Sequence, residues 1–340
     1  MAQGPMDLDA RVLDPALQAE GLQHAYQVVR RVFPPTPLVE SLSLSALLKR
    51  PVWLKLETVT PIRAFKVRGA LVKAEELAAE GETSGLVTAS AGNHGLAVAY
   101  AGRRLGRPVT VFVPEQANPV KVAGIRALGA DVRRGGRTYH ELAGQAIPFA
   151  EETGGVWVHP FDDPRVIAGQ ATVGLEIVEA LPDVREVVVP MGGGGLAAGI
   201  AVSLFQNAPA CSLVGVQMSG ADAMLRSIAE HRVVTLDHVD TIADGLAPGT
   251  VTDRTLAIVG AAARVLVRLE DHELFVAMRL LLERERVLAE PSGAAGVAAL
   301  LRGEVPGDGP VVAVVTGANV MMEHLATVMA TPLPASLAAH

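Results

Sequence analysis

Short runs of β-branched and aliphatic residues alternate with longer helical segments along this 340-residue chain. The runs are apolar at successive positions, which is typical of strands covered on both faces of a parallel sheet. They lie at residues 52–56, 86–89, 109–113, 156–159, 187–189, 213–217, 265–268 and 311–315. Between them we expect helices at residues 69–80, 95–105, 119–128, 168–179, 196–205, 271–285 and 293–301. The alternation predicts an α/β protein with open, mostly parallel sheets flanked by helices.

The composition narrows the class of protein. The chain is 50% hydrophobic and 19% charged, which is typical of a globular protein, and its length favours two domains. A net charge of −7 without long basic runs argues against nucleic-acid binding. The sequence contains neither a long apolar span nor a signal peptide, so we expect no membrane segment and a cytoplasmic location. The single cysteine, Cys211, excludes a disulfide framework and is expected to be buried, while residues 1–10 and 331–340 are expected to be loosely held.

Four consecutive glycines follow the strand at 187–189 and precede a helix: Gly192, Gly193, Gly194 and Gly195. Such a run is costly inside a regular element, because glycine loses the most backbone freedom on folding. Between a strand and a helix, the backbone N–H groups can converge on an anion at the positive end of the helix dipole. Neither a P-loop lysine nor a dinucleotide-binding glycine pattern accompanies the run. The glycines therefore predict a phosphate site, with a tightly packed turn as the alternative.

Lys66 follows the strand at 52–56 and a turn opened by Pro61. A lysine that forms an imine must lose its proton readily, so it requires partial burial or a nearby cation. Arg63 and Arg68 are close in sequence and would supply such a cation. A lysine amine and a glycine cradle are the two features that a phosphorylated aldehyde requires. Together they indicate pyridoxal 5'-phosphate (PLP), whereas a solvated lysine is the alternative for Lys66 taken alone.

A polar loop caps the strand at 86–89 and opens the next helix; it consists of Ser90, Ala91, Gly92, Asn93 and His94. Ligands bind at the carboxyl ends of strands in open α/β sheets. The loop N–H groups and the Ser90 hydroxyl would hold a carboxylate, and the Asn93 amide would reach a phenolic oxygen. Plain helix capping by Ser90 and Asn93 is the alternative.

Taken together, these segments resemble the threonine/serine dehydratase and serine racemase family of fold-type II, tryptophan-synthase-β-like PLP enzymes. The matching stretches occur in the family's order and span most of the chain. They are Thr36-Pro37-Leu38, Lys55-Leu56-Glu57, residues 64–70, residues 90–95, residues 192–196, residues 243–247, residues 290–294 and Thr316-Gly317-Ala318-Asn319. The resemblance implies two domains, a small one at 62–156 and a large one at 1–61 and 157–340, and a homodimer.

The resemblance also implies roles for individual residues. Lys66 would be the Schiff-base lysine, with Phe65 beside the cofactor ring and Asn93 bonded to its phenolic oxygen. The four glycines, together with Leu196, would hold the phosphate. Thr316 would face the pyridine nitrogen, and Gly245 and Glu290 would line the pocket near the ring. The loop from Ser90 to His94, including Ala91 and Gly92, would grip the substrate carboxylate.

Three departures from the family pattern bear on the reaction. Ala64 and Ala318 stand where serine and glycine are usual, and neither removes a group that the imine needs. Ala91 stands where serine racemases have a second serine, which disfavours racemisation. Gln217 and Ala223 stand where the family's divalent-metal site has acids, so we expect no metal; Asp222 is expected to begin a helix instead.

The expected reaction is β-elimination from L-threonine or L-serine, giving a 2-keto acid and ammonia. A neutral Thr316 would not keep the pyridine nitrogen protonated, which favours prompt loss of a β-hydroxyl over transamination, with the cofactor phosphate as a plausible acid. The alternatives are another small β-hydroxy amino acid as substrate, such as phenylserine or 3-hydroxyaspartate (the latter if Arg63 binds a second carboxylate), serine racemisation, and a catalytically silent PLP-binding protein. A nicotinamide dehydrogenase is disfavoured by the missing glycine fingerprint.

Overall fold

The computed structural model describes residues 13–334 and residue 337, which form two compact units. Unit 1 contains Pro35–Phe65 and the chain from Val173 onward, together with Leu13; unit 2 contains Asp14–Pro34 and Lys66–Thr172. The chain ends were expected to be loosely held. Of these ends, residues 1–10, 335, 336 and 338–340 lie outside the described residues. The domain boundaries that the resemblance implies, at 61/62 and 156/157, stay a prediction.

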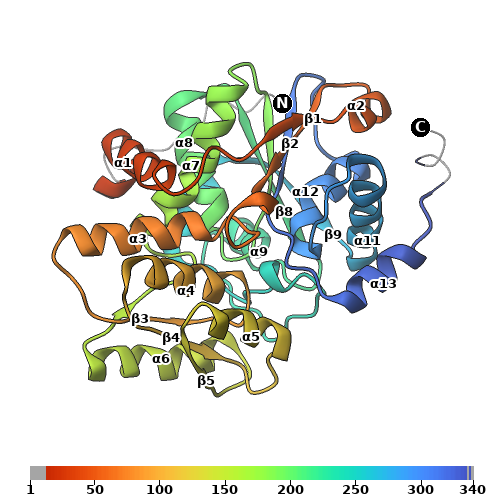
Figure 1. Cartoon of the computed structure of the whole chain (residues 1–340). Helices are drawn as coiled ribbons and strands as arrows, with labels where there is room; N and C mark the ends of the chain where they lie inside the picture. Colours follow the sequence, from red (N-terminus) through yellow and green to blue (C-terminus); the bar gives the residue numbers. More distant parts are fainter. Residues whose placement is uncertain (1–12, 335–336, 338–340) are drawn as a thin grey trace. The chain divides into compact units, whose positions relative to one another are not determined.

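Unit 1 is built on a six-stranded sheet with the strand order β1-β2-β10-β7-β8-β9 (Figure 1). Every pairing is parallel except that of β1 with β2. The strands are β1 (Leu38–Glu40), β2 (Val52–Leu56), β7 (Glu186–Pro190), β8 (Ser212–Met218), β9 (Ala263–Leu269) and β10 (Val311–Val315). The predicted open and mostly parallel α/β sheet is therefore confirmed in this unit.

Both faces of this sheet are covered, as the apolar runs require. In β10, Val311, Ala313 and Val315 point into a core formed with α11 (Asp271–Leu280) and α12 (Pro291–Arg302). The alternate side chains of β10, at residues 312 and 314, are equally buried but lie outside that cluster. Because neighbouring side chains of a strand point to opposite faces, the sheet is buried on both sides.

The remaining helical segments of unit 1 connect or flank its strands. They are α2 (Leu42–Leu48), η3 (Glu57–Val59), α8 (Gly195–Asn207), α9 (Ala223–Glu230), η4 (Asp244–Leu246), α10 (Asp253–Ala262), the π-helical turn η5 (Leu281–Glu285) and α13 (Met322–Ala330). Helix α7 (Pro164–Ala180) begins in unit 2 and ends in unit 1.

Unit 2 is built on a four-stranded, fully parallel sheet with the strand order β5-β4-β3-β6. Its strands are β3 (Leu86–Ala89), β4 (Val109–Val113), β5 (Asp131–Arg134) and β6 (Val156–Trp157). Its helical segments are η2 (Pro15–Leu17), α1 (Ala19–Arg30), α3 (Val67–Ala79), α4 (Asn93–Leu105), α5 (Pro119–Ala127) and α6 (Tyr139–Thr153). Helix α6 packs on β3 and β4 through a cluster that includes Phe112, Leu142 and Ala146.

The sequence prediction was wrong at three kinds of place. Strands β1 and β5 were not predicted, because β1 is only three residues long and mostly exposed, and β5 is mostly exposed and polar. The strand predicted at 156–159 ends at Trp157, and the helix predicted at 271–285 becomes a π-helical turn after Leu280. Several helices, among them α1, α6 and α10, lay outside the predicted segments.

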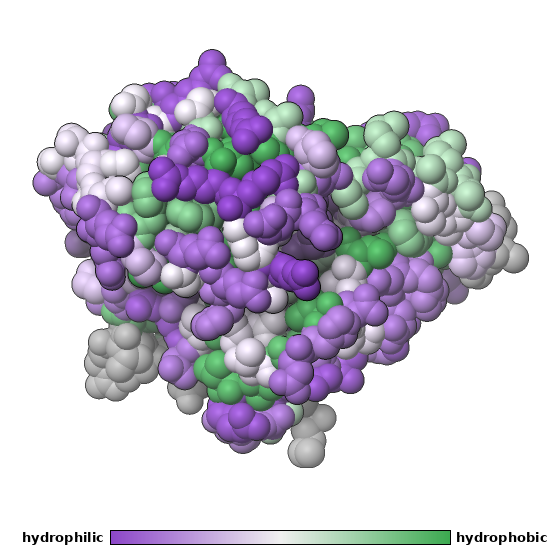
Figure 2. Space-filling model, turned by 90° about the horizontal axis from the view of Figure 1, so that it is seen from below, coloured by the Kyte–Doolittle hydropathy of each residue, from purple (hydrophilic) through white to green (hydrophobic). Residues whose placement is uncertain are grey.

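No helix among the described residues is long and apolar enough to span a membrane. On the face of the molecule seen in Figure 2, hydrophobic residues form small patches among hydrophilic ones. The most exposed large hydrophobic side chains, Leu42, Val120 and Met322, belong to different helices. Scattered single residues of this kind are normal on a protein surface.

Candidate active site

Lys66 lies at the N-terminus of α3 in unit 2, as the N-cap residue of that helix. Its Nζ atom donates a hydrogen bond of 2.6 Å to the carbonyl oxygen of Pro160. The side chain is partly buried, and this burial lowers the pKa of its amine from 10.5 to about 8. An amine with that pKa is available as a free base near neutral pH, which is what covalent bonding to an aldehyde requires.

The position of α3 is fixed by close packing against α7. A Cβ atom added to Gly169 of α7 would lie 2.5 Å from the Cα atom of Gly69 in α3. Conversely, a Cβ atom on Gly69 would lie 2.6 Å from the carbonyl oxygen of Val166. Only glycine allows the two helix backbones to approach so closely, so these residues set where α3, and with it Lys66, begins.

The segment that leads to Lys66 is held within unit 1 by the loop after β10. The Asn319 side chain donates to the carbonyl of Ile62 (2.9 Å), and the Ala318 N–H donates to that of Arg63 (2.8 Å). The Phe65 N–H donates to the carbonyl of Thr316 (3.1 Å). Arg63 is exposed and has a left-handed φ of 61°. These bonds fix the backbone that immediately precedes Lys66.

The loop from Ser90 to His94 lies between β3 and α4 in unit 2, as predicted from the sequence. The Ser90 Oγ atom accepts the Gly92 N–H (3.1 Å), and Asn93 is the first residue of α4. Ala91 is partly buried like its neighbours. The His94 ring is buried, and its Nε2 atom lies 3.1 Å from the carbonyl oxygen of Val158. Burial, and then the charge of Lys66, lower the pKa of His94 to about 3, so its neutral ring supports the loop from inside.

The glycine turn lies in unit 1 between β7 and α8, whose first residue is Gly195. Gly194 has a φ of 92°, and a Cβ atom there would lie 2.5 Å from the terminal methyl of Met224. A Cβ atom on Gly192 would lie 2.8 Å from the carbonyl oxygen of Gly245. The turn lies at the N-terminus of a helix of 13 residues, a position where backbone N–H groups bind phosphate. Gly193 lies within this turn, and the side chain of Leu196 is buried behind it.

Three further predicted residues lie in one part of unit 1. The Thr316 hydroxyl, which is buried, lies 3.3 Å from the carbonyl oxygen of Ser292. The Ser292 hydroxyl accepts the Gly245 N–H at 2.9 Å. Glu290 is the N-cap residue of α12, and its N–H donates to the Gly317 carbonyl at 3.0 Å. Gly245, Glu290 and Thr316 thus share a neighbourhood through Ser292 and Gly317.

The segment after β8 contains an amide and an ion-paired carboxylate. The buried Gln217 side chain donates to the Gly192 carbonyl (3.3 Å) and accepts the Leu225 N–H (2.9 Å). Asp222 is the N-cap residue of α9, as predicted, and its carboxylate pairs with Arg226 (2.7 Å) and Arg268 (2.9 Å). Within residues 13–334, no cluster of three His, Cys, Asp or Glu side chains is arranged to hold a metal.

Sequence reasoning missed three residues that support the predicted ones. Ser292 lies in the family motif at residues 290–294 but was given no role. Asn319 was noted only as the last residue of the motif at 316–319. His159 was assigned to a strand, although its Nδ1 atom accepts the N–H groups of Phe161 (3.2 Å) and Asp162 (2.8 Å). The only available signal for His159 was a histidine directly before a proline, which commonly marks a turn.

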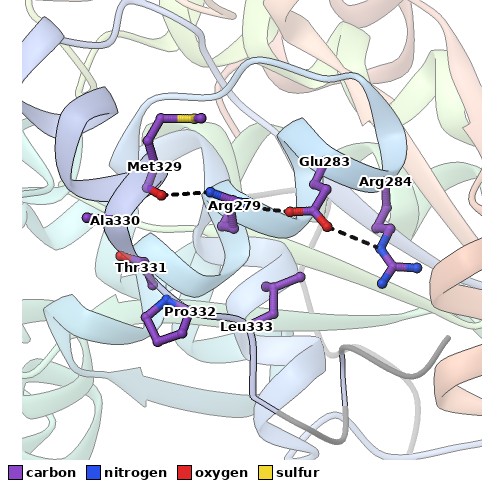
Figure 3. Close-up of a pocket in the computed structure, with 8 residues that line it drawn as sticks. All are labelled: Arg279, Glu283, Arg284, Met329, Ala330, Thr331, Pro332 and Leu333. Atoms are coloured by element: carbon purple, nitrogen blue, oxygen red, sulfur yellow. Dashed lines mark hydrogen bonds and ion pairs between the residues drawn. The ribbon is translucent and has the colours of Figure 1, made fainter.

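A surface pocket lies elsewhere in unit 1, where α11 and η5 meet the chain after α13 (Figure 3). Arg279 there donates to Glu283 (2.7 Å) and to the carbonyl of Met329 (2.9 Å), and Arg284 lies beside Glu283 (4.0 Å). The charges in this pocket are therefore paired with one another. None of the residues predicted to bind the cofactor or substrate lines it.

Residues 29–317 match the family described as pyridoxal-phosphate dependent enzyme. The chain belongs to this family. It is 38% identical over 316 residues to the L-threonine ammonia-lyase of Geobacter sulfurreducens, covering 93% of this chain and 79% of that protein. It is 39% identical over 302 residues to the L-threonine ammonia-lyase of Thermotoga maritima, covering 88% of this chain and 75% of that protein. The structure of maize serine racemase matches with a TM-score of 0.86 and 30% identity, over 92% of this chain and 96% of that one.

The family assignment agrees with the predicted cofactor and fold type, and the residues described above fit the cofactor. A partly buried amine of lowered pKa suits the aldehyde, and the glycine turn at the start of α8 suits the phosphate. The protein is therefore a PLP-dependent enzyme of fold type II.

Proposed function

We propose that the protein is an ammonia-lyase that converts L-threonine or L-serine to a 2-keto acid and ammonia. The single observation that carries this proposal is the position of Lys66 at the start of α3, with its amine 2.6 Å from the Pro160 carbonyl oxygen, in a chain of the PLP-dependent family. The similarity to two L-threonine ammonia-lyases supports the choice of substrate.

The proposal assigns one task to each part of the site. Lys66 bonds to the cofactor aldehyde, and Phe65 and Asn93 contact the ring. The N–H groups of the glycine turn, Gly192 to Gly195, and of Leu196 bind the phosphate. Thr316 faces the ring nitrogen, with Gly245 and Glu290 beside it. The backbone of the loop from Ser90 to His94 binds the substrate carboxylate.

The chemistry then depends on where protons are held. When bound, the cofactor acidifies the hydrogen on the substrate's α-carbon by accepting electrons from it. The Lys66 amine, with its pKa of about 8, is suited to take that proton as a base near neutral pH. The Thr316 hydroxyl carries no charge, so it does not force a proton onto the ring nitrogen. A neutral Thr316 beside the ring would therefore favour prompt loss of the β-hydroxyl.

Keto-acid release from a panel of amino acids tests the proposal. The panel contains L-threonine, L-serine, 3-hydroxyaspartate and phenylserine, assayed with the wild type and with Lys66→Ala. Lys121→Ala, on helix α5, is the matched control. We expect activity on threonine and serine that disappears, together with the visible absorbance of the lysine-bound cofactor, only in Lys66→Ala. Full activity of Lys66→Ala would show that another residue carries the chemistry.

Other outcomes of these assays would indicate another substrate, racemisation or a protein without activity. A preference for 3-hydroxyaspartate in the panel would indicate that the exposed Arg63 binds a second carboxylate. Racemisation is expected to be minor, because Ala91 offers no group to protonate the opposite face of the substrate. Chiral chromatography of recovered serine checks this, since equal yields of D-serine and pyruvate would contradict it. Binding of PLP without any keto-acid release would indicate a silent PLP-binding protein.

We also propose a homodimer, a cytoplasmic location and a small domain at residues 62–156, all from the family resemblance. Light scattering coupled to size-exclusion chromatography tests the dimer.

A further inference from the structure

The turn that joins β6 to α7, residues 158–163, carries the carbonyl to which the Lys66 amine donates. Its first residue is held by two side chains, since the Thr88 hydroxyl (2.9 Å) and His94 Nε2 (3.1 Å) both bond to the Val158 carbonyl. At its other end, Asp163 Oδ1 accepts the N–H groups of Arg165 (2.9 Å) and Val166 (3.3 Å) and so caps α7. The turn is therefore anchored at both ends within unit 2.

His159 holds the middle of this turn. Its Nδ1 atom accepts the N–H groups of Phe161 (3.2 Å) and Asp162 (2.8 Å), so Nδ1 carries no proton. The proton of the neutral ring is then assigned to Nε2, which lies 3.3 Å from the Tyr139 hydroxyl. The ring also packs edge-on against Phe161, with centroids 4.7 Å apart. Burial, then the charge of Lys66, lower the pKa of His159 to about 4, in agreement with this neutral form.

The bond to His159 determines where the Pro160 carbonyl points. The Phe161 N–H and the Pro160 C=O belong to one peptide group, and every described peptide bond is trans. In a planar trans peptide the two groups point in opposite directions. When the N–H is directed at His159 Nδ1, the carbonyl must be directed away from that ring. In the structure it meets the Lys66 Nζ atom at 2.6 Å.

We propose that His159 is a positioning residue, which orients the Pro160–Phe161 peptide so that its carbonyl holds the Lys66 amine whenever that amine is not bonded to the cofactor. This inference rests on the proposed role of Lys66. The Lys66 amine would need such an acceptor whenever the substrate amine is bonded to the cofactor in its place. A fixed acceptor keeps the released amine in one place, so that it is ready to act as a base and to bond again.

Two substitutions of His159 distinguish the roles of the two ring nitrogens. In His159→Asn the amide oxygen takes the place of Nδ1 and can accept the backbone N–H groups, as in an Asx turn. In His159→Gln the amide lies one bond further out, near Nε2, and faces Tyr139 instead. Both variants are polar and of similar size. His140→Asn, an exposed histidine of α6, is the matched control.

The first measurement uses the full-length chain after hydroxylamine has removed the cofactor. Reductive methylation at Lys66, followed by peptide mass spectrometry, gives the reactivity of this amine. Because one hydrogen bond of this kind contributes a free energy equivalent to about a 3–10-fold change, we expect Lys66 in His159→Gln to react about 3–10 times faster. His159→Asn and His140→Asn should react at the wild-type rate.

The second measurement uses the holoenzyme. His159→Gln should lower kcat by a similar factor of about 3–10 and change KM by less than about twofold, with His159→Asn close to wild type. The inference is overturned if the Gln variant matches the wild type, or if both variants are equally impaired, since the ring would then serve only packing. It is also overturned if kcat falls in His159→Asn but not in His159→Gln. Absence of a cofactor bond at Lys66 in the wild type would instead refute the proposed function.

Discussion

Replacing Lys66 with methionine should stabilise the cofactor-free protein while destroying its activity. Burial lowers the pKa of this amine from 10.5 to about 8, and each tenfold change in the ionisation constant corresponds to about 1.36 kcal/mol. The charged amine thus costs the folded state about 3 kcal/mol, of which the bond to the Pro160 carbonyl offsets about 1 kcal/mol. Methionine has a similar length and carries no charge. The free energy of unfolding of Lys66→Met should therefore be about 2 kcal/mol higher than that of the wild type at pH 7.

The pH dependence of this gain gives the sharper test. The folded pKa lies below the unfolded one, so the cost of charging is fully present below about pH 8 and vanishes as the pH rises toward 10.5. Urea unfolding followed by circular dichroism at pH 7 and pH 9.5 should show a stabilisation that shrinks at the higher pH. Lys121→Met, a partly exposed lysine of α5, should change stability by less than about 0.5 kcal/mol. A Lys66→Met variant that is less stable than the wild type at pH 7, or a gain independent of pH, would refute the argument.

Four further substitutions test other parts of the structure. Gly81→Ala forces alanine into a left-handed backbone at a φ of 82°, with open space around its Cβ atom, and should lose about 1–2 kcal/mol in urea unfolding. Gly194→Ala, at a φ of 92°, should lose at least as much, because its Cβ atom would also lie 2.5 Å from the Met224 methyl. Only Gly194→Ala should also weaken PLP binding in an absorbance titration, by about tenfold or more, and equal affinities would argue against the phosphate turn. Asn93→Ala should shift the visible absorbance of the bound cofactor and lower kcat about tenfold, because a bond to a charged oxygen is lost; an unchanged spectrum would contradict the contact. Lys55→Met should cost about 3–5 kcal/mol in unfolding free energy, because it removes the positive charge 2.6 Å from the buried Glu176 carboxylate, and a change below about 1 kcal/mol would show that this pair is not needed.

The fold was predictable wherever burial on two faces left an apolar run in the sequence. Strands β2, β3, β4 and β10 begin and end where the runs do, because most residues of a strand covered on both faces are hydrophobic. Two of the edge strands, β1 and β5, escape this rule, because most of their residues are exposed. Strand β5, with three exposed residues out of four, carries no pattern that separates it from a polar loop.

The candidate site was predictable only where chemistry demands one residue type. A lysine that can bond to an aldehyde and a run of glycines that can bind a phosphate are both recognisable in the amino-acid sequence. The supporting residues are not, because their role depends on partners distant in the chain. Asn319 bonds to Ile62, which lies 257 positions away, and Ser292 bonds to Gly245, which lies 47 positions away. His159 acts through its neighbours. The sequence around it does not distinguish an imidazole that accepts backbone N–H groups from one that is exposed to solvent.

The close approach of Gly69 and Gly169 has a consequence for how this chain can change over time. A methyl group on either residue would meet backbone atoms of the opposing helix at 2.5–2.7 Å, and backbone cannot be displaced by choosing another rotamer. A larger residue at one position therefore cannot be rescued by a smaller one at the other, where no smaller residue exists. Random mutagenesis with selection for growth that depends on the enzyme's activity should accordingly recover no substitution at either glycine, even alongside second-site suppressors.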